Sequence, residues 1–279
     1  MTIDFTYSKA DKLKELLDKL YDVHILKARI KNDPIEFPHL YKDPEEIELA
    51  GFIASSLSFG RIDLFKPVIR RILSFSNGSL YDYVINFDPA TDARCFDNLY
   101  YRMCKGRDIA CLIFILREVI RKHGTLGNLF YSCYYGQGNI RDGLRSFVKT
   151  LRDTDTTPIY GKRIYPRGLL QLIPSPDNGG PCKRLNMYLR WMVRPDDGID
   201  FGLWDKVPCS ALIIPVDTHI ARICKDLNMT SRKSTSWKMA EEITEGFKLL
   251  APDDPLKYDF ALCHLGISGK WKEVLLNGA

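Results

Sequence analysis

Three observations predict an all-α protein. Apolar residues recur at helical steps, as Leu13, Leu16 and Leu20 do near the start. No stretch alternates between apolar and polar residues cleanly enough to predict a strand. Prolines and glycines are concentrated between the periodic segments, most densely over residues 160–181, where they indicate tight turns between helices.

Each helix is expected from its own pattern. The leucines from Leu13 onward predict an amphipathic helix at the start. Asp43-Pro44-Glu45-Glu46 is typical of an N-cap, a first-turn proline and acidic residues near the positive helix end, and predicts a helix through about Ser58. Further periodic segments predict helices over about 64–75, 108–122, 140–152, 183–193, 218–227, 237–250 and 255–265.

Composition limits the class of protein. A chain of 279 residues with 45% hydrophobic residues can bury a core, as one large domain or as two lobes. Lys and Arg number 40 against 35 Asp and Glu, so the net charge of +5 suits a polyanionic partner without requiring one. No signal sequence precedes the first helix, and no apolar run approaches 18 residues, so we expect a cytoplasmic protein without membrane contact.

The eight cysteines form no CxxC pair, and several lie inside apolar helical segments such as residues 111–116. We therefore expect buried, reduced thiols. The histidines and cysteines show no spacing typical of metal ligands, so the sequence predicts neither a metal nor another cofactor.

The first stretch that suggests chemistry is residues 172–185, where an apolar helix end meets a Gly-rich turn and then a new helix. Glycines allow close approach of the backbone to a ligand, and a helix N-terminus attracts anions such as a DNA phosphate. Arg184, Arg190 and Arg194 are expected to add basic charge nearby. Gly-Gly-Pro between two helices is also compatible with an ordinary turn.

The second stretch is residues 213–223, in which an apolar run stops at Asp217 and a helix begins directly afterwards. Asp217 can be an ordinary N-cap, and His219 can be a hydrogen-bonded structural histidine. An N-cap role does not exclude a catalytic one, because one carboxylate oxygen can cap the helix while the other faces a substrate.

Together, Val216-Asp217-Thr218-His219 and a Gly-rich hairpin followed by a lysine resemble endonuclease III and related helix-hairpin-helix DNA glycosylases. The resemblance implies that Lys183 is the nucleophile and Asp217 the essential carboxylate. The separation, 217 − 183 = 34 residues, is longer than in endonuclease III, with residues 196–210 as the apparent insertion. A wider gap is similar to that of the archaeal 8-oxoguanine glycosylases.

Two further stretches extend the resemblance. Leu57-Ser58-Phe59-Gly60-Arg61 resembles the Leu-Ser-x-Gln element near the extruded base, with Gly60 at the glutamine position and Phe59 or Arg61 as candidates for its gap-filling role. Residues 257–266 are similar to a bacterial family attached to this superfamily. No cysteine follows Cys263, which excludes the four-cysteine cluster of endonuclease III.

The resemblance implies a chemistry that suits these residues. A damaged base must leave the stack to be attacked, and a neutral lysine amine can then displace it from the sugar through a Schiff base that permits strand cleavage. Burial and the positive end of its helix would disfavour the ammonium form of Lys183. Asp217 would stabilise positive charge on the sugar. Phe59, His219 and Trp191 are candidates for the base pocket.

The implied fold is two-lobed, with a helical barrel over residues 49–214 that carries the hairpin and a second lobe of residues 1–48 and 215–279. The active site would lie in the cleft between the lobes. The implied protein is a monomeric, nucleoid-associated repair enzyme, a glycosylase and lyase acting on double-stranded DNA with an oxidised purine. Its expected DNA contacts are Gly179, Gly180, Cys182, Arg184 and Arg61.

Two alternatives remain open at this point. A non-catalytic helix-hairpin-helix protein would keep the DNA-binding turn and lack the chemistry, which Gly60 and the long Lys183 to Asp217 spacing favour. A helical protein with no nucleic-acid role would use Lys183 and Asp217 only as an ion pair at a helix end.

Overall fold

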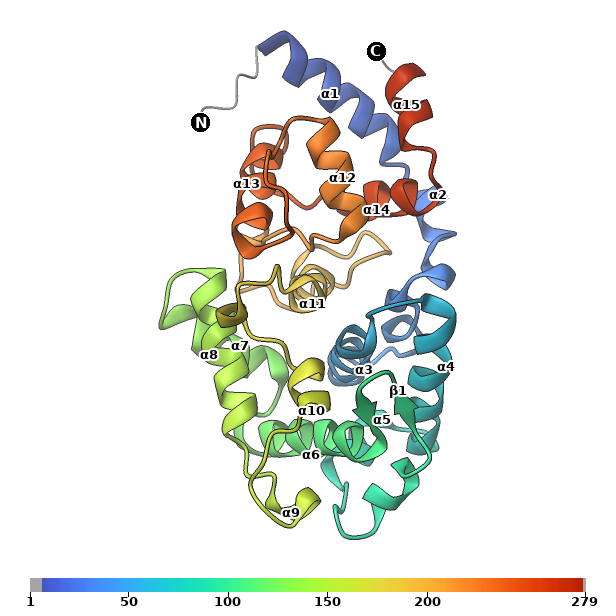
Figure 1. Ribbon diagram of the computed structural model, residues 1–279, viewed down its shortest axis with the longest axis vertical. Helices are drawn as coiled ribbons and strands as arrows, with labels where there is room; N and C mark the ends of the chain where they lie inside the picture. Colours follow the sequence, from blue (N-terminus) through green and yellow to red (C-terminus); the bar gives the residue numbers. More distant parts are fainter. Residues whose placement is uncertain (1–6, 278–279) are drawn as a thin grey trace. The chain divides into compact units, whose positions relative to one another are not determined.

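The computed structural model describes residues 7–277, and this part of the chain is mostly α-helical (Figure 1). The predicted all-α class is therefore confirmed. A single short antiparallel pair, β1 (Tyr100–Tyr101) with β2 (Cys104–Lys105), accounts for the strand content of the described residues. Strands of two residues are too short to show an alternating pattern, so the sequence did not predict them.

The described chain divides into two compact units. Unit 1 combines the residues up to Ile30 with those from Pro176 onward, and unit 2 is Lys31–Ser175. These boundaries differ from the predicted ones at 48/49 and 214/215, and they place the hairpin, Lys183 and Asp217 in the same unit. Residues 1–6 and 278–279, which belong to the predicted second lobe, lie outside the described residues.

Unit 2 is built around α6 (Gly106–His123), which contacts α5, α7, α8, α9 and α10. Residues 109–116 of α6 are all buried, as expected for a helix that is apolar on every side. Gly106 begins this helix, and only glycine fits there, because an added Cβ would lie 1.7 Å from the carbonyl oxygen of Phe96. The other helices of unit 2 are α3 (Pro44–Leu57), α4 (Ile62–Leu73), α5 (Leu80–Ile85), α7 (Leu126–Tyr135), α8 (Ile140–Asp153), α9 (Thr157–Tyr160) and α10 (Arg167–Leu172).

Unit 1 packs its helices around fully buried aromatic residues, among them Trp191, Trp204 and Trp237. Helices α11 and α12 begin at Lys183 and Thr218, as predicted, whereas α14 begins at Asp259, because residues 251–258 form successive turns. The helices are α1 (Tyr7–Leu20), α2 (Val23–Lys27), α11 (Lys183–Val193), α12 (Thr218–Asp226), α13 (Trp237–Lys248), α14 (Asp259–Ile267) and α15 (Trp271–Asn277).

Short 3-10 helices lie between the α-helices. In unit 1 they are η6 (Pro176–Asn178) and η7 (Cys209–Ala211), and in unit 2 they are η2 (Pro34–Glu36), η3 (Pro38–Leu40), η4 (Ser74–Ser76) and η5 (Asp92–Phe96). The segment η1 (Ile30–Asn32) spans the boundary between the two units.

All eight cysteines lie within the described residues, and no disulfide joins them. Cys104, Cys111, Cys182 and Cys224 are buried, whereas Cys95 is exposed. None of the described helices is both long and apolar enough to cross a membrane. Over the same residues, no group of three or more His, Cys, Asp or Glu side chains is arranged to hold a metal ion.

Candidate functional site

Lys183 is the first residue of α11 and directly follows the Gly-rich turn. The turn depends on two left-handed backbone positions, Gly179 with φ +72° and Cys182 with φ 46°. A left-handed conformation is unfavourable for a residue with a side chain, so Cys182 is held there by its surroundings. The first helical bond of α11, from the Asn186 N–H to the Cys182 carbonyl at 3.0 Å, fixes the start of the helix at Lys183.

Asp217 is the N-cap of α12. Its Oδ1 accepts hydrogen bonds from the backbone N–H groups of His219 and Ile220, at 2.8 Å and 2.9 Å. Its Oδ2 lies 3.6 Å from Nζ of Lys183. One oxygen therefore caps the helix while the other faces the candidate nucleophile, the division of roles that the sequence allowed.

The Lys183–Asp217 pair is partly accessible, because the two side chains are 32% and 18% exposed. An ion pair this exposed contributes only about 0–1 kcal/mol to stability, since water and salt screen it. The same accessibility leaves room for a ligand to reach the amine. The Lys183–Asp217 pair therefore contributes little to stability, and its two side chains are accessible to a ligand.

Helix α14 adds two residues that the sequence did not single out. The thiol of Cys263 donates to Oδ2 of Asp217 across 3.8 Å. One turn earlier, Asp259 is buried and accepts a hydrogen bond from Nη1 of Arg190 at 2.6 Å. Their spacing of four residues could have indicated a shared helix face, but nothing in the sequence showed that this face meets Asp217.

The pKa of Asp259 is raised to about 6, chiefly because the carboxyl is buried and to a smaller extent because of the negative charge of Asp217. Arg190 and Lys183 oppose both effects by favouring the carboxylate. Asp259 is thus electrostatically coupled to both members of the Lys183–Asp217 pair. The candidate site contains four ionisable side chains: Lys183, Asp217, Asp259 and Cys263.

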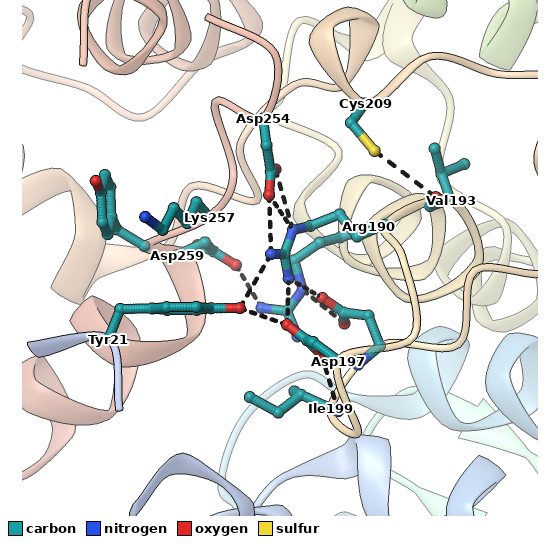
Figure 2. Close-up of polar contacts among 12 residues, drawn as sticks. Tyr21, Arg190, Val193, Asp197, Ile199, Cys209, Asp254, Lys257 and Asp259 are labelled. Atoms are coloured by element: carbon teal, nitrogen blue, oxygen red, sulfur yellow. Dashed lines mark hydrogen bonds and ion pairs between the residues drawn. The ribbon is translucent and has the colours of Figure 1, made fainter. Parts of the chain in front are cut away.

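Figure 2 shows part of a buried network in which Arg190 of α11 lies among carboxylates that include Asp197, Asp254 and Asp259. Arg190 binds Asp200 at 3.2 Å as well as Asp259, and Arg194 binds Asp254 at 2.9 Å and also Asp200. Arg190 and Arg194 are only 3% and 4% exposed. The expectation that they add basic charge at the hairpin is therefore wrong, because carboxylates neutralise both guanidinium groups inside the unit.

The predicted DNA contacts of the hairpin differ in accessibility. Residues 177–179 are exposed and Gly180 is partly so, whereas Cys182 and Arg184 are 7% and 8% exposed. A Cβ added at Gly180 would meet nothing within 4 Å. The accessible part of the turn therefore comprises Asp177, Asn178 and the glycine backbone, and the glycines suit contact through N–H groups.

Two predicted pocket residues of unit 1 have clear positions. Trp191 is fully buried, among the core aromatics. His219 packs against α14, where a Cβ added at Gly266 would lie 2.7 Å from its Cβ. Trp191 thus contributes to packing, and His219 lies between α12 and α14 beside the Asp217 cap.

The remaining candidates, Phe59 and Arg61, belong to unit 2. Phe59 is partly buried, its ring lies 4.9 Å from that of Tyr101, and its carbonyl accepts a hydrogen bond from the Tyr101 hydroxyl. Arg61 is 76% exposed and pairs with Asp63 at 2.6 Å. Between them, Gly60 has φ +85°, a left-handed backbone that disfavours a glutamine at this position.

Comparison with known proteins identifies the family. Residues 33–268 match the family described as "Protein of unknown function (DUF2400)", and the chain belongs to that family. No curated protein and no solved structure matched the chain. The matched range contains all four ionisable residues of the candidate site, so the site lies within the part of the chain that defines the family.

Proposed function

We propose that this member of the DUF2400 family is a DNA glycosylase with lyase activity, in which Lys183 is the nucleophile and Asp217 the activating carboxylate. The observation that carries the proposal is the 3.6 Å approach of the Lys183 amine to Oδ2 of Asp217, the oxygen that does not cap α12. The choice of an oxidised purine such as 8-oxoguanine as the substrate, and of a helix-hairpin-helix glycosylase fold, comes from the sequence resemblance.

The first step needs a neutral amine. Asp217 can accept a proton from the Lys183 ammonium, since the two groups lie close to proton-transfer distance and such contacts shorten when a substrate binds. The nitrogen lone pair then attacks C1′ of an extruded nucleotide. The bond between C1′ and the base nitrogen breaks, and the base leaves with the bonding electrons and takes up a proton.

The second step is strand cleavage. When the bond between C1′ and the ring oxygen breaks, that oxygen takes the proton from the lysine nitrogen, and a protonated imine forms between C1′ and Nζ. Loss of a proton from C2′ then expels the 3′ phosphate as its anion. Water finally hydrolyses the imine and regenerates the amine, so the cycle needs no cofactor.

The turn before Lys183 has a role in binding. Its exposed backbone at Gly179 and Gly180 lies immediately before a helix of 11 residues, whose N-terminus carries partial positive charge. A DNA phosphate bound there would be placed near the candidate nucleophile. Such contacts fix position and carry no base specificity.

Borohydride trapping tests the proposal, because reduction of the imine leaves a covalent protein–DNA adduct. The wild-type protein should form an adduct with duplexes that contain 8-oxoguanine or an abasic site. Lys183→Gln should form none, with an unchanged unfolding midpoint because its ion pair is partly exposed. Lys238→Gln, at an exposed lysine of α13 in the same unit, is the matched control and should be trapped like the wild type.

One observation favours a second candidate, a non-catalytic DNA-binding protein. Gly60 has a left-handed backbone that a glutamine would adopt only with strain, and this chain lacks the glutamine of the enzymes that it resembles. In that case the protein would bind duplex DNA with strong salt dependence and release no base from any lesion. Adduct formation that depends on Lys183 would exclude this alternative.

A further inference from the structure

We propose that Asp259 is a positioning residue for the candidate nucleophile: held by Arg190, its carboxylate joins α14 to α11 and places a second negative charge beside the Lys183–Asp217 pair. The effect of Asp259 on catalysis rests on the proposed function. Its contacts and its effect on the charge of Lys183 do not depend on that function.

The first support is the geometry of α11. Lys183 and Arg190 are separated by 190 − 183 = 7 residues, two helical turns, so they lie on the same face of α11. Arg190 donates to Oδ2 of Asp259 at 2.6 Å, and both side chains are 4% exposed. A charged pair this well buried is held in one arrangement, because breaking it would leave an uncompensated charge in the interior. The pair therefore fixes the start of α14 to the face of α11 that carries Lys183.

The second support is the face of α14. Asp259 and Cys263 are one turn apart, so they project from the same side of the helix. Cys263 contacts Oδ2 of Asp217, and α12 and α14 pack along one another. Helix α14 is thus attached to α11 through Asp259 and to the N-cap of α12 through Cys263. A substitution at Asp259 would therefore affect both Lys183 and Asp217.

The third support is the charge environment of Asp259. Asp259 is hydrogen-bonded to Arg190 on α11 and also interacts electrostatically with Lys183 on α11, with Asp217 at the start of α12 and with the buried thiol of Cys224 on α12. Asp200 reaches the same guanidinium group of Arg190. Because electrostatic interaction between two groups is mutual, the Lys183 ammonium that favours the Asp259 carboxylate is itself favoured by that carboxylate. Asp259 therefore helps to set the pH at which Lys183 becomes the neutral nucleophile.

Asp200 provides a matched control within the same network. It shares Arg190 with Asp259 and is fully buried, but the charges that act on it are those of Arg190, Arg194 and Asp197. Asp200→Asn therefore perturbs the same arginine without removing the charge that acts on Lys183. Any effect specific to Asp259→Asn reports its charge beside the site and not disturbance of the network.

The test is a titration of the Lys183 amine in the free protein. Lysines are dimethylated with ¹³C-formaldehyde, the Lys183 resonance is assigned from its absence in Lys183→Gln, and its chemical shift is followed with pH. Asp259→Asn should lower the midpoint by about one pH unit, the low end of the effect expected from a neighbouring charge. Asp200→Asn should leave the midpoint unchanged. Equal midpoints in the wild type and Asp259→Asn would overturn the proposal.

A second variant covers the case in which Asp259→Asn does not fold. Asp259→Ser removes the same negative charge with a smaller polar side chain and leaves Arg190 its other partner, Asp200. This variant should also lower the Lys183 midpoint. An unchanged midpoint in the folded Asp259→Ser variant would likewise overturn the proposal.

The enzymatic arm uses borohydride trapping on abasic-site DNA across a range of pH. The pH at which trapping reaches half its maximum should fall in Asp259→Asn by the same amount as the titration midpoint. If the wild-type protein forms no adduct, the proposed function fails, while the titration still decides whether Asp259 acts on Lys183. If trapping succeeds and neither midpoint moves, the role of Asp259 alone is refuted.

Discussion

Replacement of Asp217 by alanine and by asparagine separates its two roles. Oδ1 accepts two backbone hydrogen bonds at the start of α12, and Oδ2 faces the Lys183 amine. Loss of an N-cap costs about 1 kcal/mol, and loss of a partly exposed ion pair costs at most about 1 kcal/mol more. Asp217→Ala should therefore lower the free energy of unfolding by about 1–2 kcal/mol. Asp217→Asn should cost less, because its amide oxygen can still cap the helix.

Both variants should lose far more activity than stability. A carboxylate that moves protons in the transition state contributes roughly 10²–10⁴ in rate, and an amide cannot replace it. Urea denaturation gives the stability of each variant, and single-turnover base release with borohydride trapping gives the rate. A wild-type rate in Asp217→Asn would refute the role of the carboxylate. A loss of activity in Asp217→Ala alone would show that the cap, and not the charge, is what matters.

Two further predictions concern the turn and the buried carboxylate. Gly180→Val should weaken binding to damaged and undamaged duplexes alike, as measured by fluorescence anisotropy. The stability of the protein should be unchanged, because a Cβ at this position meets nothing within 4 Å. Weaker binding to a single lesion only would contradict a phosphate-binding role. The pKa of Asp259, about 6, is raised above its unfolded value, so its contribution to stability is complete below about pH 4 and is lost as the pH rises through 6. The free energy of unfolding, measured by urea denaturation from pH 4 to 7, should fall by up to about 3 kcal/mol more in the wild type than in Asp259→Asn. Parallel pH curves for the two proteins would contradict the raised pKa.

Local signals were sufficient for the elements that carry the candidate pair. Asp217 followed by an amphipathic segment predicts an N-cap, and the Gly-rich turn predicts that a helix begins at Lys183, where the structure has both. These features depend on residues within one or two turns of each other. Sequence patterns report such short-range requirements directly.

The residues that sequence reasoning missed depend on distant partners. Asp259 and Cys263 join the pair only because α14 packs on α12, and no periodicity shows which helices meet. Arg190 and Arg194 were interpreted as basic charge near the hairpin because two of their carboxylate partners, Asp259 and Asp254, lie more than 50 residues further along the chain. Asp200 is near in sequence, but nothing in the pattern showed that it is buried against them. The predicted lobe boundaries, at 48/49 and 214/215, differ from those of the two units, because the chain leaves unit 1 after Ile30 and returns to it at Pro176.

This discontinuity of unit 1 has a consequence for the order in which a newly made chain can fold. Asp18 accepts hydrogen bonds from Lys257 and Tyr258, which the ribosome adds 239 and 240 residues later. At about 5–20 residues per second, the first helix waits roughly 10–50 s for these partners, while all of unit 2 has already been synthesised. Cys263 emerges later still. A nascent chain therefore carries Lys183 before α14 exists, and the proposed reactive arrangement forms only after α14 has been synthesised.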